Sequence, residues 1–187
     1  MVPVLSLWLP ILVSAVLVFV TSAILHTVLT HHSSDFAPLP AEDEIMAALR
    51  AHNIAPGTYA MPHAASGDAM KAPAYVEKRE KGPVGLVTIL PSGSIDMTRE
   101  FVAWFIYCVV VSIFAAYISG RALDPGAPYG EAFRFAGATV FAAYALGTWQ
   151  ETIWFGQKWT TAGKNTLDGL VYALLTGGVF GWLWPGA

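Results

Sequence analysis

Histidines and acidic residues near the edges of apolar segments are the side chains in this sequence that could do chemistry. Three histidines follow the first apolar run, an aspartate stands near the start of the last one, and a glutamate and an arginine border two others. Ionisable groups at the edge of a membrane-like segment commonly pair with one another or serve an ion pathway. We therefore expect a polar cluster at one membrane interface, made of Glu151, Asp168, His26, His31, His32 and Arg99.

Two members of this set also have simpler explanations. Asp168 stands three positions after Asn165, a spacing typical of a helix N-terminus, so its carboxylate can simply cap a helix. Glu151 can be an interfacial carboxylate paired with Lys158 or Lys164. The sequence does not decide between these roles and a functional one.

The spacing of the histidines argues against a metal site. His26 and His31 differ by five positions, roughly 140° around a continuous helix, and His32 would point in another direction again. We therefore predict no metal and no cofactor. The weak alternative ligands, for copper, are Met61, His63 and Met70, in a stretch without regular periodicity.

Catalytic patterns are weaker still. Cys108 lies inside an apolar run, where ionisation of its thiol would be suppressed. The run from Ser33 to Asp35 beside His31 and His32 contains the residue types of a hydrolase triad, but neighbours in sequence do not make that geometry. We expect the protein not to be an enzyme.

Composition indicates a membrane protein. Of 187 residues, 55% are hydrophobic and 12% are charged. A soluble domain carries roughly 25% charged residues. The formal net charge of -3 provides no basic excess for nucleic-acid binding. The single cysteine excludes an intrachain disulfide.

The elements that must position the cluster are four apolar segments. We predict an all-α membrane protein with a first transmembrane helix in residues 1–32 and a three-helix transmembrane unit in residues 98–187, with spans at about 101–120, 133–155 and 166–184. A cleaved signal peptide is the alternative for the first segment. It is disfavoured because no basic residue precedes the apolar run and no clear cleavage site follows.

Residues 33–97 form the extramembrane part, which we predict to be a small α+β or partly irregular segment. The stretch 41–53 has acids in its first turn and an apolar side typical of an amphipathic helix. The stretch 84–90 is rich in β-branched residues and predicts a strand. We expect residues 60–74 to be irregular and residues 156–165 to form a short polar loop.

Small residues at four-residue spacing predict close helix packing. The candidates are Gly169, Ala173, Gly177 and Gly181 in the fourth span, and Ala143 and Gly147 in the third. Counting Lys and Arg gives eight in the first and third connections and two elsewhere, so we expect the long segment in the cytoplasm and both termini outside.

Together these features predict an integral protein of a bacterial inner membrane. We expect it to contact the bilayer and a membrane-protein partner or a second copy of itself, as an accessory, assembly or scaffolding subunit. The first alternative is an oligomeric transporter, or a protein that binds a metal or small solute through the carboxylate and histidine cluster. The second is a site for a lipophilic cofactor such as a quinone.

Overall fold

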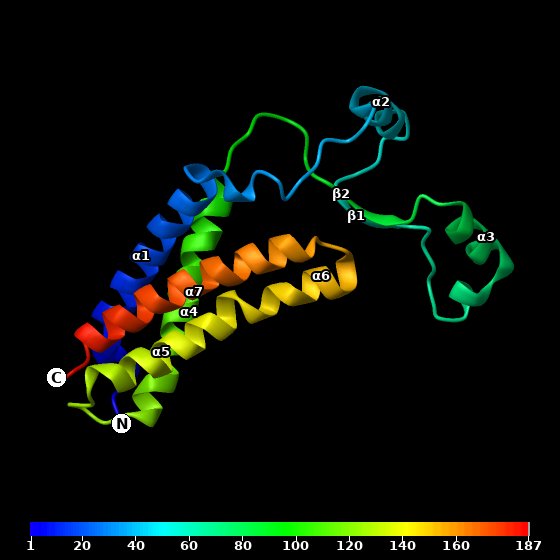
Figure 1. Cartoon of the computed structure of the whole chain (residues 1–187). Coiled ribbons are helices and arrows are strands. Elements are labelled where there is room, and N and C mark those ends of the chain that lie inside the picture. The colour runs from blue at the N-terminus through cyan, green and yellow to red at the C-terminus, as the bar shows by residue number, and fades with distance from the viewer. Residues whose placement is uncertain (187) are drawn as a thin grey trace. The chain divides into compact units, whose positions relative to one another are not determined.

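The protein is mostly helical with one small two-stranded sheet, as a computed structural model describes it for residues 1–186 (Figure 1). The chain divides into two compact units. A helical unit comprises Met1–Ala37 and Asp96–Ala187, and a second unit comprises Pro38–Ile95. This division lies close to the predicted boundaries of residues 33 and 97.

The helical unit is built from four main helical segments. A short 3-10 turn, η1 (Val4–Leu7), leads into α1 (Trp8–Thr27), and η2 (Thr30–His32) follows it. The others are α4 (Thr98–Ala122), α5 (Tyr129–Tyr144), which continues through η4 (Leu146–Thr148) into α6 (Trp149–Phe155), and α7 (Trp159–Trp182).

These helices pack in a ring. Helix α1 contacts α4 and α7, and α5 contacts the same two helices, with the α5–α7 pair the most extensive (Figure 1). Both termini meet the α4–α5 turn at one end of the unit. There the Val2 amide donates to the Gly120 carbonyl, and the Gly126 amide donates to the Pro185 carbonyl. We call this the termini end, residues 1–3, 120–128 and 184–186.

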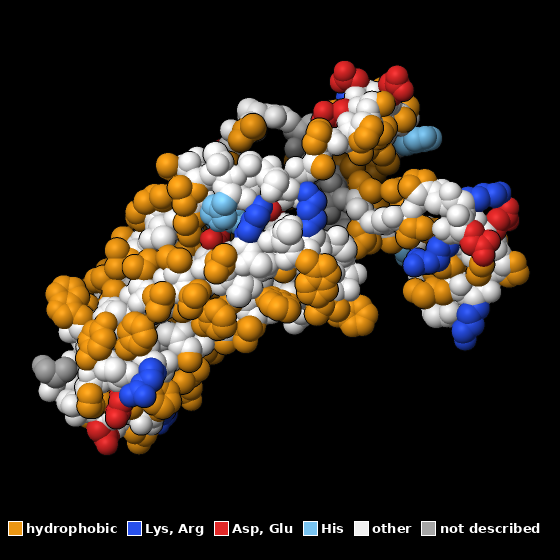
Figure 2. Space-filling model, viewed as in Figure 1, with side chains coloured by type: hydrophobic (Ala, Val, Ile, Leu, Met, Phe, Trp, Pro, Cys, Tyr) orange, Lys and Arg blue, Asp and Glu red, His pale blue; other side chains and the backbone are white. Residues whose placement is uncertain are grey.

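The buried side chains of this unit include small and polar residues beside larger apolar ones such as Leu7, Val140 and Phe180, and many other large apolar side chains lie on its outside. On α4, Cys108, Ser112 and Ala116 are buried, and Ile106, Val110 and Phe114 are exposed. Figure 2 shows the result on one face, where hydrophobic side chains cover much of the helical surface.

Glycines allow the close approach of α5 and α7. A Cβ added at Gly169 would stand 2.9 Å from the Ala145 Cβ, and one at Gly177 would stand 2.8 Å from the Phe133 carbonyl oxygen. Ala173 is buried in the same face, and a Cβ at Gly181 would meet Tyr129. The other two predicted packing residues, Ala143 and Gly147, are exposed instead.

Two helical segments, Val4–Thr27 and Thr98–Ala122, are long and apolar enough to cross a membrane. The four predicted crossings are therefore supported only in part. The predicted third span is not one straight helix, because α5 ends at Tyr144 and a 3-10 turn separates it from α6. The predicted 156–165 loop is also wrong, since α7 begins at Trp159.

The second unit holds short elements. The predicted helix and strand are present as α2 (Glu42–Ala51) and β2 (Gly85–Ile89). Strand β1 (Gly57–Met61) pairs antiparallel with β2, with Gly57 opposite Ile89, and η3 (Ala69–Lys71) and α3 (Pro73–Lys81) lie between the strands. Residues 60–74 are thus partly regular, contrary to expectation.

Candidate functional site

The end of α1 folds back toward α7 because the helix stops at Thr27. Leu29 adopts an extended conformation, and η2 then turns the chain, with the Ser33 amide donating to the Thr30 carbonyl. His31 and His32 therefore leave the course of the helix and lie beside its last turn. His26 belongs to that last turn, and its ring stacks on the His32 ring at 4.4 Å between centroids.

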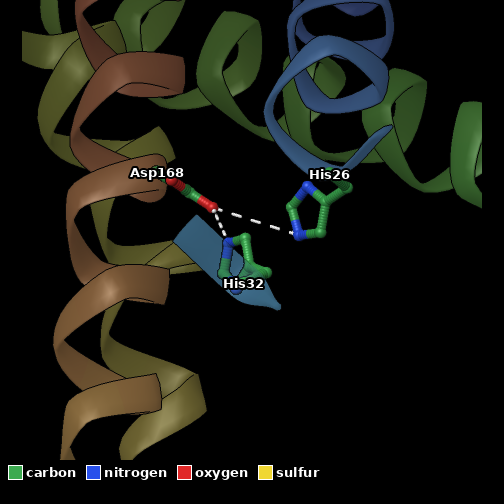
Figure 3. A group of neighbouring side chains, drawn as sticks. All are labelled: His26, His32 and Asp168. Carbon is green, nitrogen blue, oxygen red and sulfur yellow. Dashed lines mark hydrogen bonds and ion pairs between the residues drawn. The ribbon is translucent and has the colours of Figure 1, made fainter. Parts of the chain in front are cut away.

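Asp168 is the centre on which the three histidines converge. Its side chain, in α7, is only 8% exposed. His32 Nε2 donates to its Oδ2 at 2.8 Å, and His31 Nε2 donates to its Oδ1 at 3.2 Å. His26 Nε2 lies 4.0 Å from Oδ2, as Figure 3 shows for the three labelled residues.

A second carboxylate, Asp35, stands behind His32. His32 Nδ1 donates to Asp35 Oδ2 at 2.6 Å, while Lys164 Nζ and Thr161 Oγ1 donate to Oδ1 at 2.7 and 3.1 Å. Lys158 Nζ adds a bond of 2.7 Å to the Ser34 carbonyl. These contacts bind residues 33–35 to the first half of α7. We call residues 26–35 and 158–168 the histidine end of the unit.

The acid–base properties of this end follow from these contacts. Burial opposes the charged form of the His32 ring, but hydrogen bonds to Asp35 and Asp168 and their negative charges outweigh it, so the pKa of His32 is raised above 6.5. For Asp35, burial raises the pKa, but hydrogen bonds from Lys164, His32 and Thr161 and the charge of Lys164 outweigh burial and lower the pKa to about 2.

Four of the six residues of the predicted cluster are brought together: His26, His31, His32 and Asp168. The other two are not. Glu151 is exposed on α6, Arg99 is exposed in the first turn of α4, and neither forms an ion pair with the cluster in the described residues 1–186.

The capping explanation of Asp168 is wrong. Helix α7 begins at Trp159 with Lys158 at its N-cap position, so Asn165 and Asp168 lie inside the helix. The weak copper candidates belong to the second unit: Met61 ends β1, His63 follows it, and Met70 lies in η3. Their role as copper ligands stays a prediction.

Sequence reasoning missed how Asp35, Thr161 and Lys164 join the cluster. A signal was available, because Thr161, Lys164 and Asp168 follow one another at three- and four-residue spacing and so share one face of a helix. Assigning residues 156–165 to a loop concealed this face.

A mainly apolar groove of about 280 Å³ lies between α1 and α4 next to the cluster. It is lined by Phe19, Ser22, Ala23, His26, Met97, Glu100, Phe101 and Trp104. Trp104 Nε1 donates to Ser22 Oγ at 2.7 Å across it.

Comparison with known proteins provides no further assignment, because no family model, curated protein or solved structure matches the chain.

Proposed function

We propose that the protein is an integral membrane protein whose helical unit crosses the bilayer four times, and that it acts as an accessory or scaffolding subunit of a larger membrane complex. The large apolar side chains on its outside and the small residues at its closest helix contacts support the membrane location. Lipid-facing helices carry their bulky apolar groups outward and use Gly, Ala, Ser and Thr where they touch. Helix α4 follows this pattern most closely, whereas α1 also buries Ile11 and Val18.

The packing supports four crossings rather than two. Helix α5 lies against α4, and α7 lies against α1. Helices α1 and α4 are long and apolar enough to cross a membrane, so α5 and α7, which are less apolar, would lie at the same depth in the bilayer. The polar residues of α7 near Asp168 are at the histidine end, where residues 31–35 satisfy them. Helix α7 therefore contains polar residues, but contacts within the protein keep these residues away from lipid.

The distribution of positive charge supports one orientation. Lys158 and Lys164 belong to the histidine end, whereas Arg121 reaches Met1 at the termini end. Because positive residues are enriched in cytoplasmic connections, the histidine end and residues 38–95 would face the cytoplasm. A bacterial inner membrane remains the proposed location.

The carrying observation for a scaffolding role is that residues 38–95 have no buried side chain. The apolar side of α2 presents Ile45 and Met46, both exposed. A segment of this size without a core is marginal alone and gains stability when its apolar side is covered. A protein partner bound to this surface would provide that cover.

The test is purification of the tagged full-length protein at its natural level in mild detergent, followed by mass spectrometry. We expect a partner in fixed stoichiometry with the wild type. Ile45→Glu should remove it, because a carboxylate on the apolar side of α2 cannot be desolvated cheaply. Arg50→Gln, also on α2, is the matched control and should keep the partner.

Two results would contradict the proposal. One is a wild-type protein that purifies alone or only as a homo-oligomer. The other is a partner that Ile45→Glu and Arg50→Gln retain equally, since binding would then not use α2. The cluster of His26, His32 and Asp168 favours a second role, the binding of a small cation.

A further inference from the structure

We infer that the histidine end is a binding site for one divalent transition-metal ion of the zinc class, with His26 Nε2, His32 Nε2 and Asp168 Oδ2 as ligands. One ligand atom from each of these residues lies within 4.8 Å of the other two, and Asp168 Oδ2 is 2.8 Å from His32 Nε2 and 4.0 Å from His26 Nε2. The three residues come from three different elements, the last turn of α1, the η2 turn and α7 (Figure 3). The inference does not depend on the proposed scaffolding role.

Each proposed histidine ligand has a hydrogen bond on the ring nitrogen that faces away from the metal position, and these bonds support the assignment. His26 Nδ1 donates to the Ser22 carbonyl at 3.0 Å, and His32 Nδ1 donates to Asp35 at 2.6 Å. Once His32 gives up its Nε2 proton, Nδ1 holds the remaining proton of each ring, and both Nε2 atoms can offer a lone pair to the centre. Metal-bound histidines nearly always have such a partner, a carbonyl or carboxylate, on the other nitrogen.

The third ligand is oriented in the same way. His31 donates to Asp168 Oδ1 at 3.2 Å, which leaves Oδ2 turned toward His26 and His32. Each of the three ligands is therefore held by one outer hydrogen bond. When a metal binds, it takes the place of the proton that His32 Nε2 shares with Oδ2, and that proton is released to solvent.

The distances fit a first-row ion after a small adjustment. Ligand atoms around tetrahedral zinc stand about 3.3 Å apart, as bonds of about 2.0–2.1 Å require. The present separations from Oδ2 are 2.8 Å to His32 and 4.0 Å to His26. Two imidazoles and one carboxylate suit zinc and its neighbours, whereas magnesium and calcium prefer oxygen ligands alone.

The position of His26 distinguishes a metal site from a set of contacts that only hold the fold together. The bonds of His32, Asp35 and Lys164 would fix residues 30–35 to α7 without any help from His26. At 4.0 Å from Asp168 Oδ2, His26 Nε2 is too far for a hydrogen bond, yet it points at that oxygen. A metal ion bound by both atoms would give His26 a role in the cluster that its present contacts do not give it.

The test is a titration of the metal-free, full-length protein in detergent with Zn²⁺ against a chelating dye, and with Co²⁺ by visible absorption. We expect one Zn²⁺ per chain, a Co²⁺ spectrum that Zn²⁺ abolishes, and no competition by Mg²⁺. His26→Gln should weaken Zn²⁺ binding on the order of 100-fold, and His31→Gln about tenfold, as ligand and outer-partner losses do.

The matched control is His63→Gln, an exposed histidine outside the cluster, which should leave binding unchanged. His26→Gln is suited to the test because the His26 side chain is half exposed and bonds only within its own helix, so folding, monitored by circular dichroism, should be retained. Absence of stoichiometric binding, or equal binding by His26→Gln and wild type, would overturn the inference. Loss of binding in His63→Gln would also overturn it.

Discussion

The two ends of the helical unit are both closed by ion pairs, but the pairs have different surroundings. At the termini end the amine of Met1 pairs with Asp124, and these groups are 71% and 88% exposed. At the histidine end Lys164 pairs with Asp35. The Asp35 side chain is only 9% exposed and also accepts hydrogen bonds from His32 and Thr161. One end has an isolated surface pair, and the other has a connected network.

This difference indicates at which end the polar contacts contribute to stability. An exposed pair is screened by water and contributes little, whereas removing one partner of a shielded network leaves the others without compensation. Backbone bonds hold the termini end in any case, through Val2 to Gly120 and Gly126 to Pro185. The segment 33–35 depends much more on side chains.

The largest effect is expected for Asp35→Ala. The change leaves Lys164 and the Nδ1 donor of His32 without their acceptor, and we expect a loss of about 3 kcal/mol in the free energy of unfolding. Denaturant unfolding of the purified protein, in detergent with a chelator present, measures it. An effect no larger than that of Asp124→Ala would remove the contrast between the two ends.

Smaller effects are expected from glycine replacements in α7. Gly169→Ala places a methyl group 2.9 Å from the Ala145 Cβ, which cannot move aside, so we expect a loss of about 1–3 kcal/mol. Gly181→Ala would place its methyl group 2.6 Å from the ring of the exposed Tyr129 and 3.0 Å from the Tyr129 backbone oxygen; because the ring can turn aside, we expect a smaller loss. Gly163→Ala is the control, since nothing lies within 4 Å of its added methyl.

The control should gain stability, by up to about 1 kcal/mol, because alanine is the better helix former. All three changes carry that gain in helix propensity, so differences among them report packing alone. The same unfolding measurement applies. Equal values for Gly163→Ala and Gly169→Ala would mean that α5 and α7 do not approach as closely as the structure has them.

The smallest effect is expected for Asp124→Ala. Its carboxylate is exposed, and although the N-terminal amine beside it lowers the pKa of Asp124, we expect no measurable change in unfolding. The melting temperature in low and high salt checks this result. A clear destabilisation that salt abolishes would show that the termini end also depends on its ion pair.

The sequence predicted a helix or strand correctly where the residues of that one element carry the whole signal. The apolar runs of α1 and α4, the amphipathic α2 and the β-branched β2 all carry a signal within a few adjacent turns or residues. The stripe at Gly169, Ala173 and Gly177 is of the same kind, because helical spacing alone puts these residues on one face. The break between α5 and α6 had no comparably clear local signal. The early start of α7 did have one, in the spacing of Thr161, Lys164 and Asp168, but the prediction of a loop at 156–165 did not use it.

The cluster needed the tertiary structure. The sequence determined which ionisable residues stand at the edges of apolar segments, and hence that His26, His31, His32 and Asp168 were candidates. Five-residue spacing seemed to separate His26 from His31 only because a continuous helix was assumed. The chain leaves the helix after Thr27, and η2 then faces α7 across more than a hundred residues of sequence. Contacts over that separation depend on how helices pack, which no local pattern records.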